Sequence, residues 1–322
     1  MKAKLTFLGT GTSQGVPIIG CGCEVCRSTD PRDKRFRSSA LVEYGGLKIL
    51  VDAGPDFRSQ MLRAGVNHLD AILLTHDHRD HTGGLDDVRS LNYIDRRAAE
   101  IYCEERVLHS LEESYSYAFA KEKYPGAPEW NIHLIDSEPF FVEPSDAGSE
   151  LVWVRDKGYC HVNADGSFSP TGGNRIVNAE RVPEGFIAQG QCVADNPGGG
   201  CPNAGRVAVI PIRGMHDQMP VLGFRFGGIA YITDMSAIPE SEFAKLRDLE
   251  HVTLNTVGYR HHHSHFSLAE AVEIAGRINA RHTWLTHLSH TFPTYGVFDE
   301  ELKRMSERIE IHPAFDGLII EA

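Results

Sequence analysis

Three histidines and two aspartates lie within seven consecutive residues of this chain, directly after a short apolar run. The run is Ala71-Ile72-Leu73-Leu74, and the polar residues follow as Thr75-His76-Asp77-His78-Arg79-Asp80-His81. Neutral imidazole nitrogen and carboxylate oxygen are the ligands that zinc and similar cations use when one coordination position must stay open. Gly83-Gly84 follows at once and suits a tight turn into a helix. The sequence therefore predicts a metal site at the end of a buried strand.

One such cluster supplies only part of the ligands that two metals need, so the rest must come from other strand ends. Three polar residues stand at such places: His216 after Val207–Ile212, Asp234 after Ile229–Thr233, and His287 after Thr283–Thr286. Two cations about 3.5–4 Å apart lower the pKa of a bridging water and neutralise charge on a phosphoryl or carbonyl oxygen. The spacing therefore indicates a hydrolytic two-metal centre.

A second group of metal-binding residues lies near the start of the chain. Cys21-Gly22-Cys23-Glu24-Val25-Cys26 places three thiols within six residues. Structural zinc normally takes four ligands, often sulfur and imidazole together, and the expected fourth is His290, three residues after His287. Such a zinc would brace the loop that carries an active-site ligand. No defensible spacing links the later cysteines, which we expect to be ordinary thiols: Cys160, Cys192 and Cys201.

Strands and helices that could position these residues alternate through the first half of the chain. Gly45-Gly46 marks a hairpin turn, and Asp56 is expected to cap a helix. The expected strands are Leu5–Leu8, Ala40–Tyr44, Leu47–Asp52, Asp70–Leu74 and Ile101–Tyr102. The expected helices are Asp56–Ala64, Leu85–Ala99 and Arg106–Lys121.

Residues from about 139 to 206 differ from the rest. Gly, Pro, Asn, Asp and Ser are dense there and periodicity is weak, which indicates a hairpin-rich insertion. Regular elements return afterwards: strands at Val207–Ile212, Val221–Phe226, Ile229–Thr233, Val252–Asn255 and Thr283–Thr286, and helices at Leu268–Ile278, capped by Ser267, and Phe298–Ile309. The two regular halves look like similar αβ units, a pattern that fits two packed sheets with helices outside.

Bulk properties limit the class of protein. The chain has 322 residues and a net charge of −12, which argues against nonspecific binding to nucleic acid. No run reaches the roughly 18–20 apolar residues of a membrane span, and the N-terminal apolar run is too short for a secretory signal. In a chain without an export signal, seven cysteines are expected to be metal ligands or buried thiols rather than disulfides. We expect a cytoplasmic enzyme.

The ordered set of histidines and aspartates resembles the metallo-β-lactamase superfamily. The resemblance implies an α/β fold, an αββα sandwich of two packed mixed sheets with helices outside, formed by residues 1–322 as a single domain around the insertion. It assigns one divalent cation to His76, His78 and His216, and a second to Asp80, His81 and His287. Asp234 would bridge them. Zinc, manganese or iron suits these ligands.

The cysteine motif narrows the resemblance. Following Gly9-Thr10-Gly11-Thr12-Ser13-Gln14-Gly15-Val16-Pro17, it is similar to the family of phosphoribosyl 1,2-cyclic phosphate phosphodiesterases. The resemblance implies that His265, in the run His261-His262-His263-Ser264-His265, assists departure of the leaving group, with His263 as the alternative. The segment between His81 and His216 is longer than that family implies. Ser13, Gln14 and Arg37 are candidates for contacting a phosphate.

The expected activity is that of a metal-dependent phosphodiesterase opening a small cyclic phosphodiester such as phosphoribosyl 1,2-cyclic phosphate. A metal-bridged hydroxide would attack phosphorus, Asp80 would ligate and orient it, and His265 would protonate the departing oxygen. The expected partner is a small phosphorylated substrate. The oligomeric state is left open, and a homodimer is one option. Two alternatives remain: a thiolester or lactone hydrolase on the same metals, and a non-catalytic accessory protein resembling pyrroloquinoline quinone biosynthesis protein B.

Overall fold

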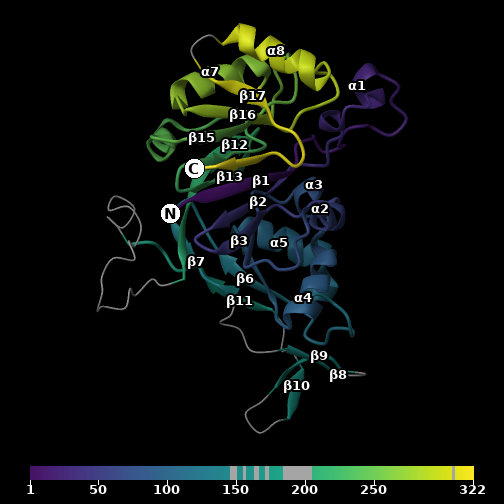
Figure 1. Ribbon diagram of the computed structural model, residues 1–322. Helices are drawn as coiled ribbons and strands as arrows, with labels where there is room; N and C mark the ends of the chain where they lie inside the picture. Colours follow the sequence, from purple (N-terminus) through teal and green to yellow (C-terminus); the bar gives the residue numbers. More distant parts are fainter. Residues whose placement is uncertain (146–150, 155–156, 163–166, 171–173, 184–204, 307–308) are drawn as a thin grey trace. The chain divides into compact units, whose positions relative to one another are not determined.

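The computed structural model describes residues 1–145, 151–154, 157–162, 167–170, 174–183, 205–306 and 309–322. The chain divides into two compact units (Figure 1), which are described separately. One unit, called here the outer unit, contains Met1–Tyr44 and Val209–Ala322. The other, called the middle unit, contains Gly45–Ala208. None of the helices in these described ranges is long and apolar enough to cross a membrane.

The middle unit contains a parallel sheet whose strands run in the order β11-β6-β5-β4-β3. The strands are β3 (Leu47–Val51), β4 (Ala71–Leu73), β5 (Ala99–Cys103), β6 (Trp130–Leu134) and β11 (Arg175–Asn178). The three residues of β4 are all buried, as expected for a strand covered on both faces. Carboxyl ends of parallel strands share one edge, so residues that follow β3 and β4 are brought together there.

Helices of the middle unit follow its strands: α2 (Phe57–Ala64), α3 (Arg79–Thr82), α4 (Arg89–Asp95), α5 (Glu105–Ser114) and α6 (Ser116–Phe119). The predicted helix Leu85–Ala99 is shorter than expected. It begins as a 3₁₀ turn at Leu85–Val88 and ends at Asp95, because Arg96 adopts a left-handed φ of 53°. Ala99 already belongs to β5. The helix expected over Arg106–Lys121 is likewise interrupted, at Tyr115.

The range predicted as an insertion contains a three-stranded antiparallel sheet of β8 (Leu151–Val154), β9 (Gly158–Val162) and β10 (Phe168–Pro170). In the same range, however, β11 pairs in parallel with β6 and extends the main sheet of the middle unit. β7 (Phe140–Val142) precedes the hairpins. The bounds 139–206 remain a prediction, and residues 184–204 lie outside the described ranges.

The outer unit contains β1 (Ala3–Gly9), which pairs antiparallel with β2 (Ser39–Tyr44) and with β18 (Ile319–Glu321). A second sheet has the order β17-β16-β15-β14-β13-β12. Its strands are β12 (Val207–His216), β13 (Met219–Phe226), β14 (Ile229–Tyr231), β15 (His251–Asn255), β16 (His282–Thr286) and β17 (Ile311–Pro313). β14 to β17 are parallel, so residues after β14 and β16 share one edge.

Two helices, α7 (Leu268–Ile278) and α8 (Tyr295–Met305), cover one face of this second sheet (Figure 1). Their buried residues pack into one apolar cluster with the strands; Ala271, Phe298 and Leu254 are all fully buried in it. α7 begins as predicted: Ser267 and Glu270 form a reciprocal capping box. A short helix, α1 (Glu24–Arg27), carries part of the cysteine motif.

Candidate metal centres

The histidine cluster of the middle unit is built by α3, a single helical turn that was not predicted. β4 ends at Leu73, and His78 is the N-cap of α3, which carries Asp80 and His81. The ring of His76 lies 4.7 Å from that of His78 and 4.3 Å from that of His81, measured between centroids. Asp80 Oδ2 lies 3.4 Å from His81 Nε2. The turn therefore brings together all four of the predicted ligands in this unit.

Asp77, the other carboxylate of the motif, faces elsewhere. Its Oδ1 pairs with Arg106 Nη1 at 2.5 Å. A carboxylate engaged by a guanidinium is a structural anchor for the loop, which agrees with its omission from the predicted ligands.

Asp52, at the end of β3, orients two residues of the cluster and was missed by the sequence analysis. Its fully buried carboxylate accepts hydrogen bonds from Thr75 N at 2.9 Å and Thr75 Oγ1 at 2.8 Å. His81 Nδ1 lies 2.6 Å from Asp52 Oδ2. Burial raises the pKa of Asp52, and the adjacent His81 opposes this shift. A polar residue after a strand, close in sequence to Gly54, was the available signal.

Hydrogen bonding assigns the same tautomer to three of the histidines. His81 Nδ1 donates to Asp52. Because the Thr75 hydroxyl donates to Asp52, its oxygen accepts from His76 Nδ1, 2.9 Å away. In the outer unit the Ser38 hydroxyl donates to Gly11 O and so accepts from His287 Nδ1 at 3.1 Å. Each ring therefore has Nε2 as its lone-pair nitrogen, which is the state a metal ligand needs.

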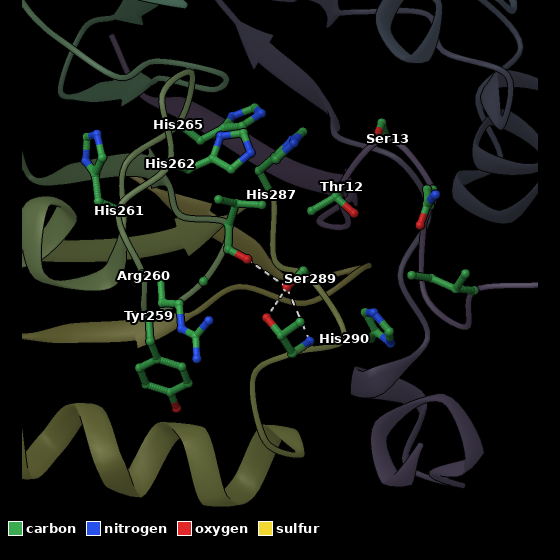
Figure 2. Close-up of a pocket in the computed structure, with 15 residues that line it drawn as sticks. Thr12, Ser13, Tyr259, Arg260, His261, His262, His265, His287, Ser289 and His290 are labelled. Atoms are coloured by element: carbon green, nitrogen blue, oxygen red, sulfur yellow. Dashed lines mark hydrogen bonds between the residues drawn. The ribbon is translucent and has the colours of Figure 1, made fainter. Parts of the chain in front are cut away.

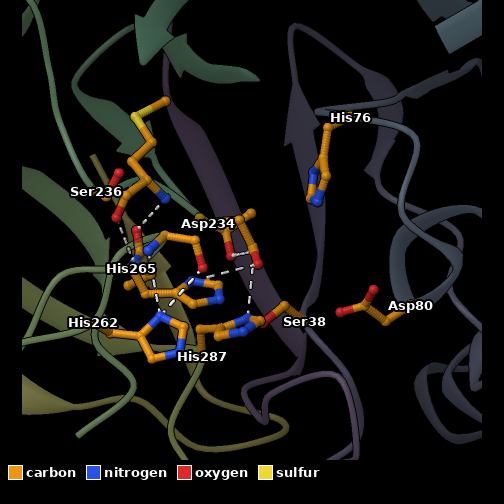
Figure 3. Close-up of polar contacts among 12 residues, drawn as sticks. Ser38, His76, Asp80, Asp234, Ser236, His262, His265 and His287 are labelled. Carbon is orange, nitrogen blue, oxygen red and sulfur yellow. Dashed lines mark hydrogen bonds and ion pairs between the residues drawn. The ribbon is translucent and has the colours of Figure 1, made fainter. Parts of the chain in front are cut away.

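The outer unit assembles its own cluster at the sheet edge (Figure 3). His216 is the last residue of β12, which is longer than predicted, while Asp234 and His287 follow β14 and β16. Asp234 and His287 are buried with left-handed φ of 57° each. Asp234 Oδ2 lies 3.3 Å from His287 Nδ1. One ligand atom each from His216, Asp234 and His265 lies within 4.8 Å of the others.

His265 lies inside this cluster rather than beside it. Its ring centroid is 4.6 Å from that of His216 and 4.7 Å from that of His287, and its Nδ1 is 3.8 Å from Asp234 Oδ1. Burial, followed by the neighbouring His287, lowers the pKa of His265 to about 3. The ring is therefore neutral near pH 7, so it can donate an N–H hydrogen bond or offer a lone pair. His263, the alternative, is exposed and stacks on His262 at 4.6 Å.

The three cysteines and His290 converge within the outer unit. Cys21, Cys23 and Cys26 Sγ lie 3.3, 3.5 and 3.7 Å from His290 Nδ1. A tetrahedral zinc with bonds of about 2.3 Å to sulfur and 2.0–2.1 Å to nitrogen holds these atoms about 3.6 Å apart. The backbone N–H of Cys26, with help from His290, lowers the pKa of Cys23 to about 6, so thiolate is available at neutral pH. The donor set and its spacing fit zinc.

The other cysteines form no comparable group among the described residues. Cys103 and Cys160 are buried and form no disulfide. Cys192 and Cys201 lie outside the described ranges.

A pocket of about 680 Å³ lies next to both sites in the outer unit (Figure 2). His265 and His287 line one part of it and His290 another. Ser13 and Gln14 also line it, as candidates for phosphate contact should. Arg37 instead donates from Nε to the carbonyl oxygen of Ser13 at 2.9 Å and so supports the loop.

Comparison with known proteins places this geometry in a family. The sequence matches the beta-lactamase superfamily domain over residues 48–159 and 187–288. A solved structure described as a new diphosphatase from the PhnP family superposes with a TM-score of 0.71 and 31% identity, covering 100% of this chain and 98% of that one. Zinc-bound PqqB from Methylobacterium extorquens superposes with a TM-score of 0.60 over 98% and 99% of the chains, at 16% identity, a likeness of fold alone.

Curated sequences give two further similarities. An octanoyltransferase of Porphyromonas gingivalis is 34% identical over 317 residues, which cover 98% of this chain but 51% of that protein. A ribonuclease Z of Bradyrhizobium diazoefficiens is 40% identical over 83 residues, 25% of this chain and 22% of that protein. The chain thus spans about half the length of the first relative and less of the second.

These similarities confirm the predicted αββα class, with two packed mixed sheets and helices. They also identify a hydrolase that binds divalent metal, and they do not favour the accessory-protein alternative. The chain belongs to the beta-lactamase superfamily and, within it, to the PhnP family.

Proposed function

We propose that the chain is a metal-dependent phosphodiesterase that opens a small cyclic phosphodiester such as phosphoribosyl 1,2-cyclic phosphate. The observation that carries the proposal is the common tautomer of His76, His81 and His287, set by hydrogen bonds at Nδ1. Buried histidines that bind no metal have no reason to share the tautomer in which Nε2 carries the lone pair. Family membership and the carboxylates of Asp80 and Asp234 support the same conclusion.

Seven residues would hold two divalent cations, zinc or manganese. They are His76, His78, Asp80, His81, His216, Asp234 and His287. Bound cations of this kind polarise a phosphoryl oxygen and lower the pKa of water. The mixture of imidazole and carboxylate donors suits them, and a carboxylate such as Asp234 offsets repulsion between two cations.

The residues themselves supply orientation and proton handling. Asp52 holds the ring of His81 in position, as Ser38 does for His287. Asp80 would be a metal ligand, and its carboxylate would accept a hydrogen bond from the attacking water and so fix the direction of that water toward phosphorus. His265, neutral at the working pH, donates its N–H to the departing oxygen and steadies the charge that develops there.

The cysteine site would hold one structural zinc through Cys21, Cys23, Cys26 and His290. His287 and His290 stand on one loop after β16. Zinc at His290 therefore restrains the backbone that carries His287, so the structural site supports the catalytic one.

The experiment is a substrate panel with metal analysis. Wild-type chain and His265→Ala are assayed on ribose 1,2-cyclic phosphate, bis-p-nitrophenyl phosphate and octanoyl thiolesters. An alkoxide needs help in leaving, whereas p-nitrophenolate does not, so His265→Ala should slow the ribose substrate by about 10²–10⁴-fold and the nitrophenyl ester much less. If the variant lost equal activity on the ribose substrate and on the nitrophenyl ester, with its metal content intact, His265 would not be the residue that assists the leaving group. Loss of metal in the variant would make it a ligand instead.

The thiolester alternative has one specific support, the similarity to the P. gingivalis octanoyltransferase. Because the chain spans about half of that protein, its acyl chemistry does not transfer directly to this half. Turnover of thiolesters alone would establish the alternative and overturn the phosphodiesterase.

A further inference from the structure

One histidine beside the pocket of the outer unit has no role in the proposed function. His262 lies on the loop between β15 and α7 and lines the pocket together with His265 and His287 (Figure 2). Its ring centroid is 5.2 Å from that of His265, and the two rings lie side by side in Figure 3. A side chain in this place is close enough to the reacting group of a bound ligand to take part in its chemistry.

The contacts of His262 with Ser264 determine which ring nitrogen carries the proton. The backbone N–H of Ser264 donates to His262 Nδ1 at 3.3 Å, and the Ser264 hydroxyl lies 3.2 Å from the same nitrogen. A backbone N–H cannot accept a hydrogen bond, so Nδ1 carries the lone pair and the proton of the neutral ring is on Nε2. Burial, followed by the neighbouring His263, lowers the pKa of His262, which keeps the ring neutral near pH 7.

This tautomer is the opposite of the one found at three of the proposed ligands. His76, His81 and His287 have Nε2 as the lone-pair nitrogen, whereas His262 carries an N–H there. A ring in this state cannot bind a cation through Nε2, and its Nδ1 is already occupied by Ser264. Among the residues that the structure describes, none accepts a hydrogen bond from His262 Nε2. His262 therefore brings a hydrogen-bond donor to the pocket and not a metal ligand.

The ring of His262 is held in place before any ligand arrives. It stacks on His263 with centroids 4.6 Å apart and an angle of 26° between the ring planes. Ser264, which fixes Nδ1, is buried, and the loop is closed at its base, where Val257 N donates to Phe266 O at 3.2 Å. A donor that is fixed in advance needs no reorganisation when charge develops beside it.

We propose that His262 is a second catalytic histidine, whose Nε2–H donates a hydrogen bond to a phosphoryl oxygen that stays on phosphorus, while His265 acts on the departing oxygen. The proposal rests on the proposed function and adds a residue to it. During attack on phosphorus, negative charge is spread over the oxygens that do not leave, and a fixed N–H donor beside one of them stabilises that charge. No proton leaves His262, so its ring is in the same state before and after the reaction.

The tautomer of His262 can be measured in the zinc-loaded chain without any substrate. Nitrogen-15 NMR of the imidazole rings distinguishes a protonated ring nitrogen from one that carries a lone pair, and the spectrum of His262→Gln identifies the signals of His262. We expect the proton of His262 on Nε2 and that of His287 on Nδ1. A neutral His262 with its proton on Nδ1 would overturn the proposal.

Binding of orthovanadate to the zinc-loaded chain, measured by calorimetry, tests the donor itself, because this anion adopts the five-coordinate geometry of phosphorus under attack. His262→Phe keeps a ring but no donor. It should weaken orthovanadate binding about tenfold or more and lower kcat for phosphodiester hydrolysis about 10²–10³-fold. His262→Gln keeps an N–H donor and should recover most of both losses. His263→Phe is the matched control: His263 is exposed and is not among the residues that line the pocket, so this variant should bind orthovanadate as the wild type does.

The same variants separate this proposal from the proposed function. If orthovanadate binding falls in His262→Phe and returns in His262→Gln, but the wild type hydrolyses no phosphodiester, the proposed function is overturned and His262 remains the donor of the pocket. If the wild type hydrolyses a phosphodiester and His262→Phe does so equally well, or if His262→Gln loses as much as His262→Phe, the role of His262 is overturned and the proposed function stands.

Discussion

Asp52 shows how much the proposed metal centre would depend on a residue outside its set of ligands. Its buried carboxylate contacts His81 directly and reaches His76 through the hydroxyl of Thr75. Removing a partner of this kind typically lowers metal affinity or activity by about 10–100-fold. The effect comes from lost control of tautomer and ring orientation, since the ligands themselves remain.

We therefore predict that Asp52→Asn binds active-site metal about 10–100-fold more weakly. An amide has nearly the same shape, but its NH₂ group offers no acceptor for His81 Nδ1. Competition with a chromophoric chelator measures the change. Asp56→Asn is the control, because it makes the same chemical change in the same unit at a residue outside the proposed ligands and their hydrogen-bond partners, the N-cap of α2. Equal affinity of the two variants would contradict the role given to Asp52.

The cysteine site gives a second prediction at the residue scale. Cys23→Ser should remove one zinc per chain and lower the unfolding temperature, while metals at the histidine clusters remain. The reason is that oxygen of serine does not replace a thiolate whose pKa is lowered to about 6. Elemental analysis and thermal unfolding measure both effects.

The control for that variant separates zinc from packing. Cys103→Ser places a hydroxyl in a fully buried position and should also lower stability, but with zinc content unchanged. If Cys23→Ser keeps the full zinc content, the four residues hold no zinc through Cys23.

At the scale of elements, the position of α3 depends on Gly54, because any side chain at that residue would collide with the helix. A Cβ on Gly54 would lie 2.0 Å from the carbonyl oxygen of Asp80, which is closer than any real contact. Gly54 follows β3 by three residues, and Asp80 belongs to α3. The close approach of these two segments is what turns Asp80 and His81 toward His76.

Gly54→Ala should therefore displace α3, destabilise the chain by about 1–3 kcal/mol and weaken active-site metal binding. Urea unfolding and metal titration measure the two effects. Gly276→Ala is the control: Gly276 lies in α7 with nothing within 4 Å of its added Cβ, so alanine should stabilise by about 0.5–1 kcal/mol. If Gly54→Ala changed neither stability nor metal binding, α3 would tolerate the displacement.

The elements also show what sequence patterns can and cannot predict. Polar residues expected after apolar runs do lie at or just beyond strand ends of their units, because such runs are a strong signal: His76, His216, Asp234 and His287. The sequence signal for helix ends was weaker. The helix α4 ends before Arg96, which adopts a left-handed conformation although no glycine marks that position in the sequence. α3 has four residues and no periodicity to detect. Asp52 gave only the weak signal of a polar residue at a strand end, because its role depends on His81, which lies on another element.

At the scale of the whole molecule, the ligands of the proposed two-metal centre come from both units. His76, His78, Asp80 and His81 belong to the middle unit, and His216, Asp234 and His287 belong to the outer unit. If these residues hold two cations together, as proposed, metal binding becomes part of the folding equilibrium of the chain. The consequence can be measured without any substrate.

We predict that adding metal at 100 times its Kd raises the free energy of unfolding by about 2.7 kcal/mol for each tightly bound ion. His76→Ala and His287→Ala take one ligand from each unit. If the proposed centre is shared, either variant should lose most of the increment for both ions, and the double variant should lose little more. If each unit bound metal independently, the two losses would add. Additive losses, measured by urea unfolding with and without metal, would thus reject a common centre and leave two separate sites, one in each unit.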